Sequence, residues 1–103
     1  MMQLTKKQKE ELKRELIFCL NKDKEIVKIV LFGSFVNSDN PKDMDIAVFQ
    51  DSNEGYLPLS MKYRKRTRVI SKKIPLDIFP VKSQVNTDPF LSEIAKGVVI
   101  YER

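Results

Sequence analysis

Three aspartates of this sequence, Asp43, Asp45 and Asp77, occupy positions where an aspartate is not expected to stabilise the fold. Asp43 and Asp45 flank Met44, and residues two apart in a β-strand project from the same face. Like charges that share a face repel one another unless something positive lies between them. Asp77 interrupts the apolar run of residues 74–79, where an unpaired carboxylate is costly. Together they are the ligand set expected of a two-metal phosphoryl-transfer site holding Mg²⁺, with Mn²⁺ as a second candidate ion.

The alternative is that these acids lie at strand ends and on an edge strand. They would then point into solvent or pair with lysines, and an Asp-x-Asp pair by itself is common. A third feature, Gly33-Ser34, directly follows the apolar run of residues 26–32. Glycine allows close backbone approach to a ligand, and a hydroxyl beside free amides suits phosphate oxygens. Gly-Ser is also an ordinary way to open a loop.

The composition excludes several other chemistries. The 103 residues include no histidine, so Ser-His-Asp catalysis and imidazole proton shuttles are excluded. Cys19 is the only cysteine, which excludes an internal disulfide and a thiolate zinc cluster. No apolar run is long enough to cross a membrane, and no signal peptide is recognised. We therefore expect one domain over residues 1–103, located in the cytoplasm, with no membrane partner.

The elements that must position these residues follow from periodicity and from turn signals. A Thr5-x-x-Gln8 capping box opens a helix with an apolar stripe, to which Cys19 belongs and which Ile17 and Phe18 are expected to widen. We expect helices over residues 6–22, 57–73 and 89–96, and strands over residues 26–32, 44–49, 74–79 and 98–101. Pro75 restricts its strand to starting near the edge of a ladder or at the first residue of the strand. The predicted fold class is α/β (α+β), a small mixed β-sheet flanked by helices.

Basic residues crowd the second of these predicted helices. Without them the rest of the chain carries a small negative charge, although the whole chain carries +5. Five of them can share one broad helix face: Lys62, Lys65, Arg66, Lys72 and Lys73. That face could contact nucleic-acid phosphates, an acidic partner protein or a substrate triphosphate, or could simply be solvated. Only Tyr56 and Tyr63 lie nearby, so the stacking surface of a single-strand binder is lacking.

The order of these motifs resembles the minimal nucleotidyltransferases of the DNA polymerase beta-like superfamily. Their signature is a hydrophobic residue, Gly-Ser, a spacer, Asp-hydrophobic-Asp-hydrophobic and a later Asp. The matching residues here are Phe32-Gly33-Ser34, Asp43-Met44-Asp45-Ile46 and Asp77. The resemblance covers nearly the whole chain. The spacer Phe35–Lys42 is slightly short, with Phe35 and Asn37 where the family usually has small and basic residues.

The resemblance implies a polymerase beta-like fold and the transfer of a nucleoside monophosphate to an acceptor hydroxyl. The nucleotide donor would be ATP, which supplies AMP, or another NTP, which supplies the corresponding monophosphate. It implies that Gly33 and Ser34 hold phosphates, and that Asp43 and Asp45 bridge two Mg²⁺ ions. Asp77 would complete the site on the acceptor side. It further implies an antitoxin whose acceptor is a tyrosine of a helical HEPN-type toxin. The alternatives are a non-catalytic module that neutralises a partner by occlusion and an enzyme that modifies a small molecule.

Overall fold

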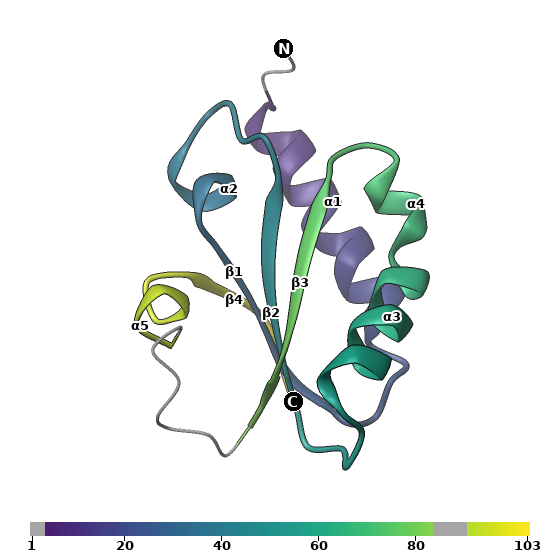
Figure 1. Cartoon of the computed structure of the whole chain (residues 1–103). Helices are drawn as coiled ribbons and strands as arrows, with labels where there is room; N and C mark the ends of the chain where they lie inside the picture. Colours follow the sequence, from purple (N-terminus) through teal and green to yellow (C-terminus); the bar gives the residue numbers. More distant parts are fainter. Residues whose placement is uncertain (1–3, 84–90) are drawn as a thin grey trace.

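A four-stranded mixed sheet of order β3-β2-β1-β4 organises the molecule (Figure 1). The computed structural model describes residues 4–83 and 91–103. The strands are β1 (Ile26–Phe32), β2 (Met44–Gln50), β3 (Leu76–Lys82) and β4 (Val98–Glu102). β1 runs antiparallel to β2 and β4, whereas β3 runs parallel to β2. The mixed sheet with flanking helices confirms the predicted fold class.

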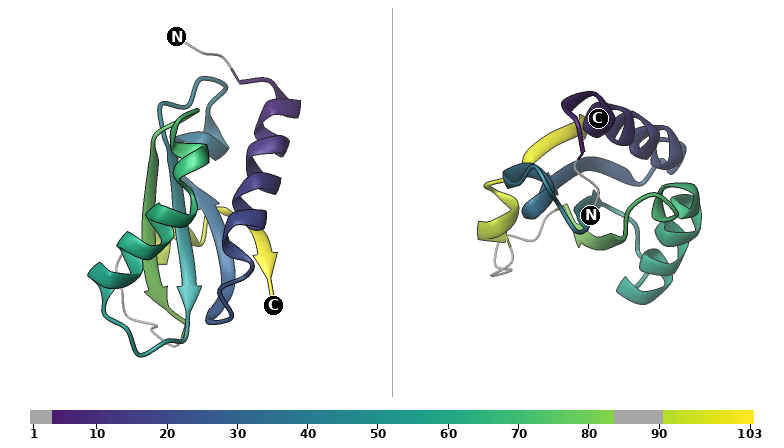
Figure 2. Two further views of the ribbon diagram at one scale, coloured as in Figure 1. Left: turned by 90° about the vertical axis from the view of Figure 1, so that its right-hand side faces the viewer. Right: turned by 90° about the horizontal axis from the view of Figure 1, so that it is seen from above.

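Helices lie on both faces of the sheet (Figure 2). One face is covered by α1 (Lys6–Leu20), α3 (Tyr56–Arg66) and α4 (Arg68–Ser71), whose apolar side chains form the larger core with the sheet. The short α5 (Leu91–Ile94) lies on the other face, where Ile94 joins a smaller cluster around Val30, Phe32 and Ala47. Among the residues that the structure describes, helices therefore cover the second face only in part.

The first helix begins where its sequence predicts and ends earlier. Thr5 and Gln8 form the expected capping box. The helix ends at Leu20, two residues before the predicted end at residue 22. Cys19 packs at the border of the larger core, as expected. The expectation that Phe18 widens the apolar stripe is wrong, because it is 69% exposed. Position 18 lies two residues from buried Leu16, and two helical steps point a side chain to the opposite side.

The predicted helix over residues 57–73 is broken at Thr67. The Thr67 hydroxyl donates to the Tyr63 carbonyl oxygen at 2.8 Å, and its backbone leaves the helical region, with φ −103° and ψ 15°. The Tyr63 carbonyl oxygen also accepts from the Thr67 backbone amide at 3.1 Å, and a threonine hydroxyl that bonds to the preceding turn in this way often bends a helix. The inner-face residues of both pieces are nevertheless buried as predicted, namely Leu59, Tyr63, Thr67 and Ile70.

Two further elements differ from their predicted form. A short helix, α2 (Ser34–Asn37), follows β1 where only a polar connection was expected. β3 starts at Leu76 rather than at residue 74 and continues through Pro80 to Lys82. A proline without an amide hydrogen is tolerated there because β3 is an edge strand. Of the helix predicted over residues 89–96, the first two residues lie outside the described part of the chain.

The described part of the chain contains no helix that combines the length and the hydropathy of a membrane-spanning segment.

Candidate functional site

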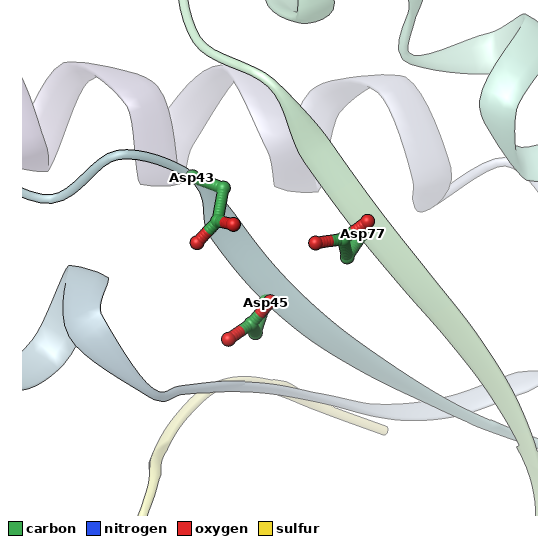
Figure 3. A group of neighbouring side chains, drawn as sticks. All are labelled: Asp43, Asp45 and Asp77. Atoms are coloured by element: carbon green, nitrogen blue, oxygen red, sulfur yellow. The ribbon is translucent and has the colours of Figure 1, made fainter.

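Strand register brings the three aspartates together on the face opposite α1 and α3 (Figure 3). Asp45 of β2 and Asp77 of β3 are direct partners in the parallel ladder, so their side chains leave the same face side by side. Asp43 immediately precedes β2 and lies two residues from Asp45. Met44 and Ile46, which alternate with the acids, are fully buried in the larger core. Core burial of these alternate residues therefore fixes the face on which the acids project.

The carboxylates form a compact half-buried cluster. One oxygen from each of Asp43, Asp45 and Asp77 lies within 4.8 Å of the others. Burial, the charges of Asp43 and Asp77, and a hydrogen bond to Asp77 together raise the pKa of Asp45 to about 6, and burial contributes most. The cluster thus concentrates negative charge that the protein itself leaves poorly compensated.

These donors fit a divalent cation. In the described residues, no lysine or arginine forms an ion pair with any of the three acids. Carboxylate oxygens are the ligands that Mg²⁺ and Mn²⁺ prefer, and a bound cation would offset the repulsion that raises the Asp45 pKa. Asp43, Asp45 and Asp77 are therefore the residues that would hold a metal.

Gly33 lies against this cluster. Its φ of +75° is a backbone conformation that residues with a side chain rarely adopt, and a Cβ there would collide with Oδ2 of Asp45. Asp45 is paired across β1 and β2 with Phe32, the residue before Gly33, which explains the close approach. The exposed Ser34 hydroxyl donates to Oδ1 of Asp43 at 3.5 Å. The Gly33-Ser34 pair thus borders the acids, as its place in the sequence predicts.

Sequence reasoning missed the contact that supports the segment after Ser34. Lys9 of α1 donates to the Ser38 carbonyl oxygen at 2.6 Å and lies 5.5 Å from the ring centre of Phe35. Phe35 is itself buried in the larger core. The short spacer is therefore held at Phe35, within α2, and at Ser38, directly after it. No sequence signal distinguishes Lys9 from its neighbouring lysines, since only the packing of α1 brings it to α2.

The basic residues do not form the single broad face that was expected. The break at Thr67 separates Lys62 and Arg66 from Lys72 and Lys73. Lys62 contacts Glu25 at 2.9 Å and Asp23 at 3.6 Å. Arg66 binds Asp23 through two hydrogen bonds of 3.3 Å, and Lys73 pairs with Glu15 at 2.6 Å. Acids that are distant in sequence thus neutralise part of the basic set, whereas Lys65 remains exposed.

Comparison with known proteins gives one family. The family described as polymerase beta, nucleotidyltransferase matches residues 14–103, which include every residue of the acidic cluster and the Gly33-Ser34 pair. A search of curated proteins finds no match to the chain.

Proposed function

The chain belongs to the polymerase beta nucleotidyltransferase family, and from that premise we propose that it transfers AMP from ATP to an acceptor hydroxyl on a second protein. The observation that carries the proposal is the cluster of Asp43, Asp45 and Asp77, whose oxygens lie within 4.8 Å on one face of the sheet. Nucleotidyl transfer is the general activity of the family. The donor nucleotide, the two Mg²⁺ ions and the acceptor are parts of the proposal.

In the proposed reaction the acceptor oxygen attacks the α-phosphorus of ATP. The bond from that phosphorus to the oxygen bridging the α- and β-phosphates breaks, and pyrophosphate leaves. Asp43 and Asp45 would hold the metal ions, with Asp77 completing the site beside the acceptor. Bound Mg²⁺ would neutralise triphosphate charge and lower the pKa of the attacking hydroxyl. Because the sequence has no histidine, we assign the departing hydroxyl proton to Asp77.

Gly33 and Ser34 are the proposed contacts to the phosphates. Gly33 lets the backbone lie directly against the Asp45 carboxylate, because a Cβ at this position would collide with Oδ2. The Ser34 hydroxyl is exposed and lies within reach of Asp43, so it borders the cluster without being buried by it. Both features support a triphosphate bound at the surface where the Gly33-Ser34 pair borders the acids.

The proposed acceptor is a tyrosine of a helical HEPN-type protein, which AMP transfer would silence, so that this chain would act as an antitoxin. This part of the proposal rests on the resemblance of the motifs to stand-alone minimal nucleotidyltransferases. The proposed location is the cytoplasm, where ATP and Mg²⁺ are both available. The competing hypothesis is that the chain neutralises the partner by binding and occluding it, without catalysis.

Co-production of the chain with a HEPN-type partner tests this acceptor. We expect growth arrest by the partner to be relieved by the native chain and by Asp51→Asn, an exposed control at the other end of β2. Asp45→Asn should fail to relieve it while still binding the partner. The partner isolated from rescued cells should carry one added AMP on a tyrosine in its mass spectrum. Rescue by Asp45→Asn with an unmodified partner would establish occlusion instead.

A further inference from the structure

A groove of about 900 Å³ lies away from the acidic cluster. It is lined by residues of α3, α4 and Leu76, the first residue of β3. Leu76 packs against the larger core on the helix-covered face, and the alternation of a strand directs Asp77 to the opposite face. The groove and the acidic cluster are therefore separated by the thickness of the sheet, and neither uses the side chains of the other.

The lining of the groove is strongly basic and contains no acidic residue. Two of its cations, Lys62 and Arg66, are paired with Asp23 and Glu25. The others are exposed and form no ion pair within the described part of the chain, namely Arg64, Lys65 and Arg68. Three uncompensated positive charges at one groove are electrostatically complementary to an anionic ligand.

Apolar side chains lie among these charges. Met61, Pro58 and Leu76 line the groove, and Met61 is 64% exposed. Leu57, one helical turn before Met61, is also exposed. A phosphate backbone would leave this apolar surface in water. Methionine and leucine exposed beside cations instead fit a ligand that carries apolar and acidic side chains together.

The aromatic content of the region argues against single-stranded nucleic acid. Tyr63 is fully buried, and its hydroxyl donates to Glu25 at 2.9 Å, so its ring offers no stacking surface. Tyr56 is exposed at the start of α3, but it does not line the groove. Proteins that bind single strands stack bases on exposed aromatic rings. A protein ligand is the better match.

We propose that the groove between α3, α4 and the start of β3 docks an acidic amphipathic segment of a partner protein. Arg64, Lys65 and Arg68 receive its carboxylates, and Met61 with Pro58 receives its apolar side chains. The ion pairs of Lys62 and Arg66 hold α3 in place and leave the remaining cations free for the partner. Docking does not depend on nucleotidyl transfer, because no lining residue belongs to the acidic cluster.

Fluorescence anisotropy with a labelled synthetic helical peptide tests this docking. The peptide carries leucines spaced by one helical turn and glutamates on the flanking positions. The reference probes are the same peptide with glutamine at every glutamate, and a single-stranded RNA of equal charge. Lys65→Glu/Arg68→Glu tests the cations and Met61→Gln tests the apolar contact. Lys6→Glu/Lys7→Glu, at exposed positions of α1, is the control with the same change in net charge.

We expect the acidic peptide to bind. Lys65→Glu/Arg68→Glu should weaken binding by about tenfold or more, because two cations that receive carboxylates are replaced by repelling charges. The native chain should bind the glutamine peptide more weakly than the acidic peptide by a similar factor. Met61→Gln should weaken binding of the acidic peptide by about fivefold. Lys6→Glu/Lys7→Glu should stay within about twofold of the native chain, since exposed distant charges are screened. Circular dichroism of each variant should match the native spectrum.

Several results would overturn the docking proposal. One is no binding of the acidic peptide at about 1 mM, the weak end of measurable association. Others are equal weakening by Lys65→Glu/Arg68→Glu and by the α1 control, or an unchanged affinity in Met61→Gln. RNA binding at least as tight as peptide binding would assign the groove to nucleic acid. None of these results bears on catalysis, so failure of docking and failure of AMP transfer remain distinguishable.

Discussion

Asp45 is the residue in which stability and proposed activity are in conflict. Its carboxyl group lies between Asp43 and Asp77, and burial together with those charges raises its pKa to about 6. The folded state therefore binds this proton more tightly than the unfolded chain does. In the absence of metal, the protein loses stability as the pH rises from 3.8 to about 6. A site that binds a cation is expected to be unfavourable without one.

Asp45→Asn should therefore stabilise the metal-free protein at neutral pH. A pKa raised from 3.8 to about 6 corresponds to about 3 kcal/mol, and solvent screening at this partly exposed group should reduce the gain to about 1 kcal/mol. Urea denaturation with and without chelator measures it. Mg²⁺ should raise the free energy of unfolding of the native chain and of Asp51→Asn, and leave that of Asp45→Asn unchanged. A destabilised Asp45→Asn in chelator would contradict the account.

Gly33→Ala tests the close approach beside Asp45. The added Cβ would collide with the Asp45 carboxylate, and alanine is strained at a φ of +75°. We expect a loss of about 1–3 kcal/mol in the free energy of unfolding, measured by urea denaturation. Gly55→Ala is the matched control, because Gly55 has ordinary φ and its nearest neighbour is 3.7 Å from the added carbon. Equal stability of the two variants would show that the space beside Asp45 is not constrained.

At the scale of elements, α1 supports α2 through Lys9. Its ammonium group binds the Ser38 carbonyl oxygen at the end of α2, while Phe35 anchors the same turn in the core. The family match starts at residue 14, so Lys9 lies outside the matched region. A segment outside that match thus fixes the turn that begins with Ser34.

Lys9→Met should loosen α2 without touching the acidic cluster. We expect the KM for nucleotide to rise by about fivefold, equivalent to about 1 kcal/mol for one charged hydrogen bond, with little change in kcat. Steady-state kinetics with the acceptor protein measures both constants. Lys7→Met, at an exposed position of α1, is the control and should behave as the native chain. A fall in kcat with unchanged KM would refute the positioning role.

The ion pairs between α3 and the turn before β1 form a second supporting contact. Burial alone would raise the pKa of Glu25, but hydrogen bonds from Lys62 and Tyr63 outweigh it, and the net pKa is lowered below 4.5. Glu25 therefore contributes stability that is present above pH 4.5 and is lost as the pH falls through its lowered pKa. Asp23, only 7% exposed, binds Arg66 through both carboxylate oxygens.

Asp23→Ala should cost about 2 kcal/mol in the free energy of unfolding, because it removes the buried carboxylate that binds Arg66, whereas Lys62 keeps its ion pair with Glu25. Glu10→Ala removes the exposed pair with Lys13 and should cost less than about 0.5 kcal/mol. Urea denaturation at neutral pH compares the two variants. Equal losses would mean that the α3 contact stabilises no more than a surface pair.

Sequence patterns predicted the elements better than the contacts between them. The β-branched run of β1 and the buried stripe of Leu12, Leu16 and Leu20 each follow from one local segment. The break at Thr67, whose hydroxyl bonds to the Tyr63 carbonyl, is not revealed by the hydrophobic period. The Asp43 and Asp45 pair follows from strand alternation. The position of Asp77 beside this pair could not be predicted in the same way. It results from the parallel register of β2 and β3, which depends on the order of strands in the sheet.

At the scale of the whole molecule, opposite charges are distributed to opposite faces of one sheet. The acids lie on the face opposite α1 and α3, and the basic groove lies beside the helices on the other face. The chain has a net charge of +5 even though its candidate site is negative. In this account a partner can be held at the groove while the acids remain accessible to nucleotide and metal.

The central claim is that the acidic cluster catalyses nucleotidyl transfer, and label transfer from ATP tests it most directly. The native chain, Mg²⁺ and the co-produced partner are incubated with ATP labelled at the α-phosphate or, in parallel, at the γ-phosphate. We expect only the α-label to become attached to the partner, and we expect chelator or Asp45→Asn to abolish the attachment while Asp51→Asn does not. Transfer of the γ-label, α-label that persists in Asp45→Asn, or no labelled protein at all would contradict it.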